Sequence, residues 1–192
     1  MKALLLAVLA IAVVGGGSYA FVRYRIAEDI EKGRPIAETR TAERDRREAS
    51  AQREKTLTGL LTTLEDSLRT HPSDSMLVLS AANISYDLGK FDNAVRYYRR
   101  FLDSVDPTNR SVRIDYAYAL YQTGRQDEGM KELAEVIRLD PSNQAALLNL
   151  AVMHAQAQRF DEALRWFRRC RDVDSTSDLG QRAAMAITQL QN

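Results

Sequence analysis

Apolar and polar residues divide the chain into three regions. Residues 3–22 carry no charged side chain, whereas charged side chains dominate residues 36–55. From residue 57 onward, apolar residues recur three or four positions apart, which is typical of helices with one buried face. The pattern therefore predicts an all-α chain with an apolar segment, a charged segment and a long helical region.

The helical region repeats itself every 34 to 35 residues. Small residues mark equivalent positions in each repeat, namely Ala82, Ala117 and Ala151, followed twelve residues later by Ala94, Gly129 and Ala163. Seven residues after each first alanine stand Gly89, Gly124 and Gln158. Self-similarity at this period indicates stacked supersecondary units. Such stacks act through an extended surface, so we expect binding rather than catalysis.

Each repeat is predicted to be a pair of helices joined near the glycine position. The pairs are 76–88 with 93–105, 112–122 with 128–139, and 145–157 with 162–173. Glycine supplies the left-handed conformation that ends the first helix. The mid-helix alanine lets the second helix approach, and Tyr98, Leu133 or Phe167 fills the space beside it. A proline follows the pair in Asp106-Pro107 and Asp140-Pro141 but is missing from Asp174-Ser175.

These residues resemble the tetratricopeptide repeat. Together with the apolar N-terminal segment, they resemble bacterial repeat proteins that have an N-terminal membrane anchor. The closest match runs from Gln144 to Ala151 and continues through Phe160-Asp161-Glu162-Ala163. The resemblance implies a solenoid of three helical hairpins within 72–176, at 75–109, 110–143 and 144–176. The alternative is an ordinary helical bundle whose alanines align by chance.

The chain departs from the family pattern at several positions. Val78, Arg113 and Leu147 stand where the family often has tryptophan. Gln126 and Gly129 are expected to weaken the second helix of the second hairpin.

Helices on both sides of the repeats are expected to cap them, because a single hairpin cannot bury its own apolar face. Residues 177–192 predict an amphipathic capping helix that begins at Ser177 or Asp178. Its apolar face comprises Leu179, Ala183, Ile187 and Leu190. Residues 57–71 predict a helix that packs on the first repeat through Leu57, Leu60, Leu61, Leu64 and Leu68.

The N-terminal region, 1–25, is predicted to be a transmembrane anchor or a secretory signal. Residues 3–22 are long enough to cross a bilayer core of about 30 Å. Basic residues flank the segment directly, which favours an uncleaved single-pass anchor in the cell membrane. The alternative is cleavage after Ala20, which would leave a secreted or periplasmic protein. The side of the membrane that holds the repeats, cytoplasmic or periplasmic, stays open because both flanks are basic.

Two further expectations concern the segments next to the membrane. Ala12, Gly16 and Ala20 form a small-residue face that could let two anchors pack into a homo-oligomer. Residues 26–56 predict a charged helical stalk or linker, because opposite charges such as Glu43 and Arg47 lie four residues apart.

The composition gives little support for chemistry. A net charge of +1 argues against a nucleic-acid partner. The single cysteine, Cys170, is expected to serve packing, and His71 and His154 share no metal-ligand spacing with it. No phosphate-binding or nucleophile motif occurs. We therefore expect a protein that is not an enzyme and that uses neither cofactor nor metal.

Binding of a protein or peptide remains as the expected function. In the tetratricopeptide family the first helices line a concave groove, which here would contain Leu79, Asn83, Tyr86, Ile114, Asp115, Tyr118, Tyr121, Leu148, Asn149 and Val152. About half of these could simply pack helix against helix. A clamp for a C-terminal carboxylate is disfavoured because Leu79, Asp115 and Ala145 replace the expected basic or polar grips.

Two functional classes follow. The first is a membrane-tethered scaffold or adaptor that recruits a partner into the groove. The second is an extracytoplasmic chaperone or assembly factor for a membrane complex, similar to bacterial repeat proteins of cytochrome c maturation. The side of the membrane on which the repeats lie discriminates between them.

Overall fold

The computed structural model describes residues 36–191, with side chains from residue 41 onward. The chain divides into two compact units with a boundary between Pro72 and Ser73. The expected anchor and its small-residue face at Ala12, Gly16 and Ala20 lie outside the described residues. Within residues 36–191, no helix has both the length and the apolar character needed to cross a membrane.

The described part of the first unit is one uninterrupted helix, α2 (Ile36–Thr70). It includes residues 36–56 of the expected stalk and nearly all of the expected packing helix, whereas residues 26–35 of the stalk lie outside the described residues. Exposed side chains of α2 bond to residues one turn away in the same helix. Arg44 pairs with Glu48 one turn later at 2.8 Å, and the Thr56 hydroxyl donates to the carbonyl of Gln52 at 2.9 Å. The helix ends just before Pro72, which has no N–H to continue it.

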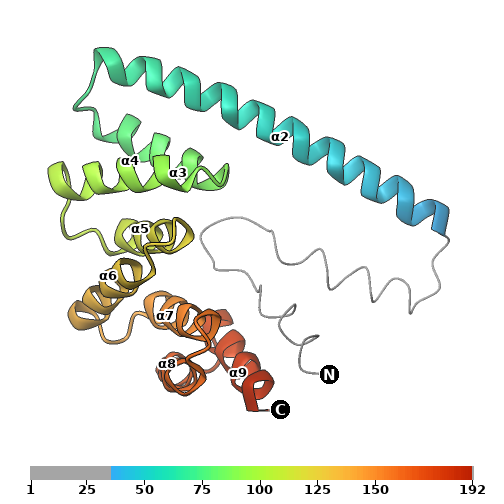
Figure 1. The fold of residues 1–192 in the computed structure, drawn as a ribbon, viewed down its shortest axis with the longest axis vertical. Helices are drawn as coiled ribbons and strands as arrows, with labels where there is room; N and C mark the ends of the chain where they lie inside the picture. The colour runs from blue at the N-terminus through green and yellow to red at the C-terminus, as the bar shows by residue number, and fades with distance from the viewer. Residues whose placement is uncertain (1–35, 192) are drawn as a thin grey trace. The chain divides into compact units, whose positions relative to one another are not determined.

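Seven helices make up the described part of the second unit. They are α3 (Ser75–Asp87), α4 (Phe91–Ser104), α5 (Arg110–Gln122), α6 (Gln126–Leu139), α7 (Gln144–Gln156), α8 (Phe160–Val173) and α9 (Asp178–Gln191). Figure 1 shows α3 to α8 as three successive hairpins, coloured from green to orange. Each hairpin packs on the next through α4 with α5 and α6 with α7. The expected all-α repeat fold of three hairpins is confirmed.

The first helix of each hairpin begins at a side chain that accepts backbone hydrogen bonds. Asp74 accepts from the N–H groups of Met76 and Leu77 at 2.9 and 3.1 Å. Asn109 and Asn143 do the same for the third residue after themselves, at 3.1 and 3.0 Å. Each cap satisfies amide groups that have no partner inside the helix.

An aspartate organises the turn that follows each hairpin. Asp106, Asp140 and Asp174 each accept hydrogen bonds from the backbone N–H and the hydroxyl of the residue two positions later. These bonds lower the pKa of all three carboxyl groups. Asp174 keeps this turn although serine replaces the proline, so the missing proline does not change the hydrogen bonds that define the turn.

The turn inside each hairpin has one residue in the left-handed conformation. Gly89 and Gly124 have φ values of 67° and 83°, and Gln158 adopts a φ of 60° at the equivalent position. The predicted role of the two glycines is confirmed. Gln158 carries a Cβ into a region that costs most residues about 1 kcal/mol or more.

The small residues sit where the paired helices approach most closely. Ala82, Ala117 and Ala151 have no exposed surface. Gly129 of α6 lies so near to α5 that a Cβ at this position would be 2.5 Å from the carbonyl oxygen of Ala117. Gly129 lowers helix propensity, as expected from the sequence, but it also permits a backbone contact that alanine would block.

The C-terminal helix α9 packs on α8 and, to a smaller extent, on α7. Ser177 begins it, because its hydroxyl accepts from the N–H of Gly180 at 3.0 Å. Ala183 and Ile187 of its predicted apolar face are buried. Cys170 is also buried, and burial raises its thiol pKa to about 11, in agreement with a packing role.

Candidate binding surface on the first helices

The ten predicted groove residues fall into two groups by exposure. Ile114, Tyr121, Leu148 and Asn149 are buried. Tyr121 also donates from its hydroxyl to the carbonyl of Met153 at 3.5 Å, so it bridges the second hairpin to the third. The other six are at least partly exposed, namely Leu79, Asn83, Tyr86, Asp115, Tyr118 and Val152. The accessible part of the predicted surface therefore lies mainly on α3 and α5.

Aromatic rings from three helices meet in this accessible part. Tyr86 of α3 lies 5.4 Å from Tyr118 of α5 and 5.8 Å from Phe91 of α4, measured between ring centroids. Phe91 and Tyr118 are 6.0 Å apart, and Tyr98 adds a fourth ring 6.3 Å from Tyr86. Three of the four pairs meet edge to face, an arrangement that places the positive edge of one ring on the negative face of another.

A largely buried carboxyl group lies beside these rings. Burial raises the pKa of Asp115 to about 6, and the negative charge of Asp87 adds to this shift. No arginine or lysine within residues 41–191 forms an ion pair with Asp115. We call Tyr86, Phe91, Tyr98, Asp115 and Tyr118 the aromatic–acidic cluster.

The three tyrosine hydroxyl groups of the cluster remain protonated and uncharged near neutral pH. Burial raises the pKa of Tyr86 and of Tyr98, and the charge of Asp115 raises both further. Burial also raises the pKa of Tyr118. Tyr98 donates to the side-chain oxygen of Asn83 at 2.9 Å, which fixes the exposed asparagine beside the rings. Asp115 is therefore the group of the cluster that can change charge near neutral pH.

Sequence reasoning missed two members of the cluster. Phe91 recurs as Phe160 in the third repeat, and such a recurrence indicates the repeat rather than a site. Tyr98 was expected only to fill the space beside Ala82, and it is indeed buried, with 1% of its surface exposed. Both belong to α4, the second helix of its hairpin, whereas the predicted groove drew only on first helices. The recurrence of an aromatic residue at the start of α4 was the available signal.

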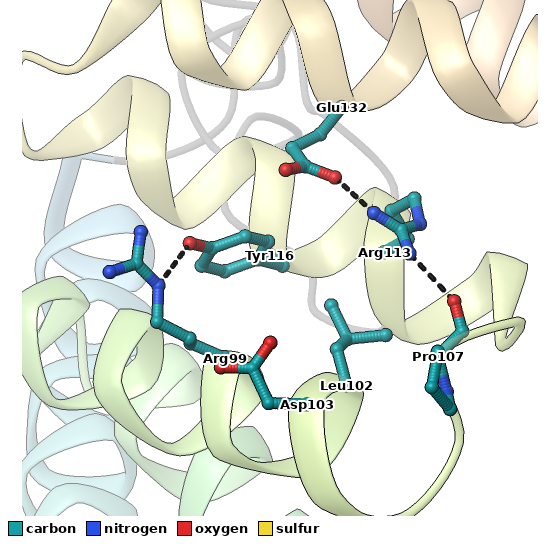
Figure 2. Close-up of a pocket in the computed structure, with 7 residues that line it drawn as sticks. All are labelled: Arg99, Leu102, Asp103, Pro107, Arg113, Tyr116 and Glu132. Carbon is teal, nitrogen blue, oxygen red and sulfur yellow. Dashed lines mark hydrogen bonds and ion pairs between the residues drawn. The ribbon is translucent and has the colours of Figure 1, made fainter.

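A pocket of about 540 Å³ opens on the other side of α5. Tyr116 lines it, and two residues correspond to about 200° around a helix, so it points away from Tyr118. Figure 2 shows that both arginines of the pocket are already engaged. Arg99 donates to the Tyr116 hydroxyl at 2.9 Å, while Arg113 pairs with Glu132 and donates to the Pro107 carbonyl at 2.6 Å.

These contacts give Arg113 a structural role. It stands where the family often has tryptophan, and it connects the turn after the first hairpin to α6. Arg113 is paired with Glu132, and Arg99 donates to the neutral hydroxyl of Tyr116, so both guanidinium groups are held by contacts with neighbouring helices. We read it as a polar joint between hairpins.

The remaining candidates for chemistry do not assemble into a site. His71 is exposed in the turn after α2, and His154 is half-buried in α7, where burial lowers its pKa. Within the described part of the chain, no three histidine, cysteine or acidic side chains are grouped closely enough to hold a metal ion.

Comparison with known proteins gives one family and several relatives. The family model described as Tetratricopeptide repeat matches residues 79–143 and 130–175, together about half of the chain. The TPR repeat-containing thioredoxin TTL4 of Arabidopsis thaliana is 36% identical over 93 residues, which are 48% of this chain and 14% of that protein. The Protein CTR9 homolog of the same plant is 29% identical over 90 residues, 47% of this chain and 8% of that protein.

The matched segment is thus a small fraction of these two relatives. Among solved structures, MamA MSR-1 superposes with a TM-score of 0.58 at 22% identity and covers 62% of this chain and 68% of that chain. The first TPR domain of the human RPAP3 protein gives 0.53 at 18% identity and covers 62% and 94%. At these identities the two structures support the fold alone.

Proposed function

The chain belongs to the tetratricopeptide repeat family, and from this premise we propose that it is a membrane-tethered scaffold that binds a protein segment at the aromatic–acidic cluster. The family fold is a scaffold for protein–protein interaction and is typically non-catalytic. One observation carries the choice of surface. Three half-exposed aromatic rings and a carboxyl group converge from α3, α4 and α5.

The chemistry of the cluster suits a peptide or protein partner. Tyrosine and phenylalanine bury a large apolar area with few rotatable bonds, which is why aromatic residues are enriched at interfaces. Asn83 and the tyrosine hydroxyls provide polar contacts at the edge of the rings. An extended or helical segment that places apolar side chains on the rings fits this surface.

Replacement of Tyr118 by alanine tests the binding surface. Selection of a random peptide library on the full chain should yield binders whose affinity falls at least tenfold in the Tyr118→Ala variant. Trp166→Ala is the matched control, because Trp166 is a half-exposed ring of α8 outside the cluster. Equal losses in both variants, or a loss of helical circular dichroism in Tyr118→Ala, would argue against this surface.

Membrane tethering is proposed from residues 3–22, whose uncharged apolar sequence matches the thickness of a bilayer core. An anchored chain should stay in the membrane fraction at alkaline pH and keep its original N-terminus. A mature chain that begins at residue 21 and is released into the soluble fraction would refute the anchor.

The side of the membrane selects between the two functional classes. The test fuses to Asn192 a reporter that is active only in the cytoplasm. If the protein is an extracytoplasmic assembly factor, this reporter should give no signal. A cytoplasmic signal would favour the adaptor, and its absence, with a complementary signal from an extracytoplasmic reporter, would favour the assembly factor.

A further inference from the structure

We propose that the aromatic–acidic cluster recognises a lysine or arginine side chain carried by the bound segment. This inference rests on the proposed function, since it names the residue that such a segment would place between α3 and α5. The occupant is a polypeptide, and its cationic side chain is the determinant of specificity.

Charge complementarity is the first reason. The negative charge of Asp87 acts on Asp115, and the charges of both act on the hydroxyls of Tyr86 and Tyr98. The nearest basic candidate on α5, Arg113, lies two residues from Asp115 and is held by Glu132 and the Pro107 carbonyl on the other side of the helix. Asp115 is therefore a largely buried acid without a basic ion-pair partner among residues 41–191, and a cation of the bound segment is its complement.

The rings are the second reason. A cation is attracted to the negative face of an aromatic ring, most strongly where water is excluded. The rings of Tyr97 and Trp166 already carry an arginine of the chain, at 5.2 and 4.8 Å from the centroid. No such internal arginine stacks on Tyr86, Phe91 or Tyr118 among the described residues. All three residues are partly exposed, so a side chain of the partner can reach the rings.

The burial of Asp115 is the third reason. A carboxylate removed from water without a cationic partner destabilises the folded chain when it ionises. A lysine or arginine that enters the cluster supplies the missing partner and removes this penalty. The equivalent residue of the third repeat is the neutral Asn149, so the fold itself does not require an acid at this position.

Ionisation of Asp115 gives the interaction a defined pH dependence. The groups that face it are Asp87 and Tyr86 from α3, Tyr98 from α4 and Tyr118 from α5, and the tyrosines remain neutral. A cationic segment should therefore bind more tightly as the pH rises from about 5 to about 7 and Asp115 loses its proton. A segment with an uncharged residue at the same place should show little change over this range.

The test uses the full 192-residue chain and four pools of acetylated, amidated octapeptides. The central residue is fixed as lysine, arginine, norleucine or glutamate, and the other seven positions are random. The lysine and arginine pools should bind at least tenfold more tightly than the norleucine pool, and the glutamate pool most weakly. Asp115→Asn should reduce binding of the two basic pools about tenfold and leave the norleucine pool within twofold.

Asp103→Asn is the matched control, because Asp103 is an exposed acid of α4 that lines the pocket on the other side of α5. It should leave all four affinities unchanged. Equal binding of the basic and norleucine pools, or basic binding that survives in Asp115→Asn, would overturn the inference while the proposed binding surface stands. Failure of every pool to bind would overturn both.

Discussion

The second and third hairpins solve the same packing problem with different residues. The second has glycine both at its left-handed turn and at its closest helix contact, as Gly124 and Gly129, where the third has Gln158 and Ala163. The second also carries Asp115 where the third carries the buried amide of Asn149. The third hairpin therefore tolerates strain in its turn, whereas the second combines a very close helix contact with a largely buried, destabilising acid.

The largest expected effect comes from a methyl group at the close contact. Gly129→Ala places a Cβ about 2.5 Å from the Ala117 carbonyl, so α6 must move away from α5, and we expect a loss of about 3 kcal/mol in unfolding free energy. Urea denaturation followed by circular dichroism measures it.

Ala163→Gly is the matched change in the third hairpin. It should cost about 2 kcal/mol, since it lowers helix propensity and removes one buried methyl group. If Gly129→Ala proved neutral or stabilising, the backbone contact would not limit the approach of α6.

The next effect concerns the acid that distinguishes the two hairpins. Asp115→Asn should stabilise the chain at pH 7, by at most about 3 kcal/mol, because it removes a carboxyl group that the fold prefers to keep protonated. Folding raises the pKa of Asp115 from 3.8 to about 6. The protonated carboxyl group therefore contributes its full stability to the wild type below about pH 3.8, and this contribution is lost as the pH rises through about 6.

The difference between variant and wild type should consequently vanish near pH 3.5 and reach its plateau above about pH 6.5. Asp106, Asp140 and Asp174 have lowered pKa values, so the stability they contribute is lost as the pH falls. These three carboxyl groups are present in the wild type and in Asp115→Asn, so their contributions cancel in the difference in stability between the two. A constant difference at all pH values would mean that the two side chains differ in packing rather than in charge.

The smallest effect should come from an exchange of the turn residues. Gln158→Gly should stabilise the third hairpin by about 0.5 kcal/mol, because relief of the left-handed backbone exceeds the entropy that glycine adds to the unfolded state. Gly124→Gln should destabilise the second by about 1 kcal/mol. Thermal unfolding of both variants gives the sign of each change, and two changes of the same sign would contradict the comparison.

The repeat pattern predicts most of this fold because its signals are local. A glycine that must adopt positive φ and an alanine beneath a crossing helix each act within a few residues. The sequence therefore identified three hairpins and the role of Gly89 and Gly124.

The candidate surface was harder to predict because it depends on contacts between hairpins. Tyr118 and Tyr121 lie on the same helix and look equivalent in the sequence, yet Tyr121 turns toward Met153 of α7. Phe91 joins the cluster only because the start of α4 lies beside α5. The orientation of one hairpin on the next decides such cases, and no short-range pattern encodes it.

Gly129 has a further consequence for how three similar hairpins find their proper partners during folding. Near-identical repeats can exchange helices and become trapped in a misassembled chain. A helix with alanine at the Gly129 position, as in α4 and α8, could not take the place of α6 against α5 without displacing the Ala117 carbonyl. The absence of one methyl group thus distinguishes α6 from its siblings and disfavours α4 or α8 in its place against α5.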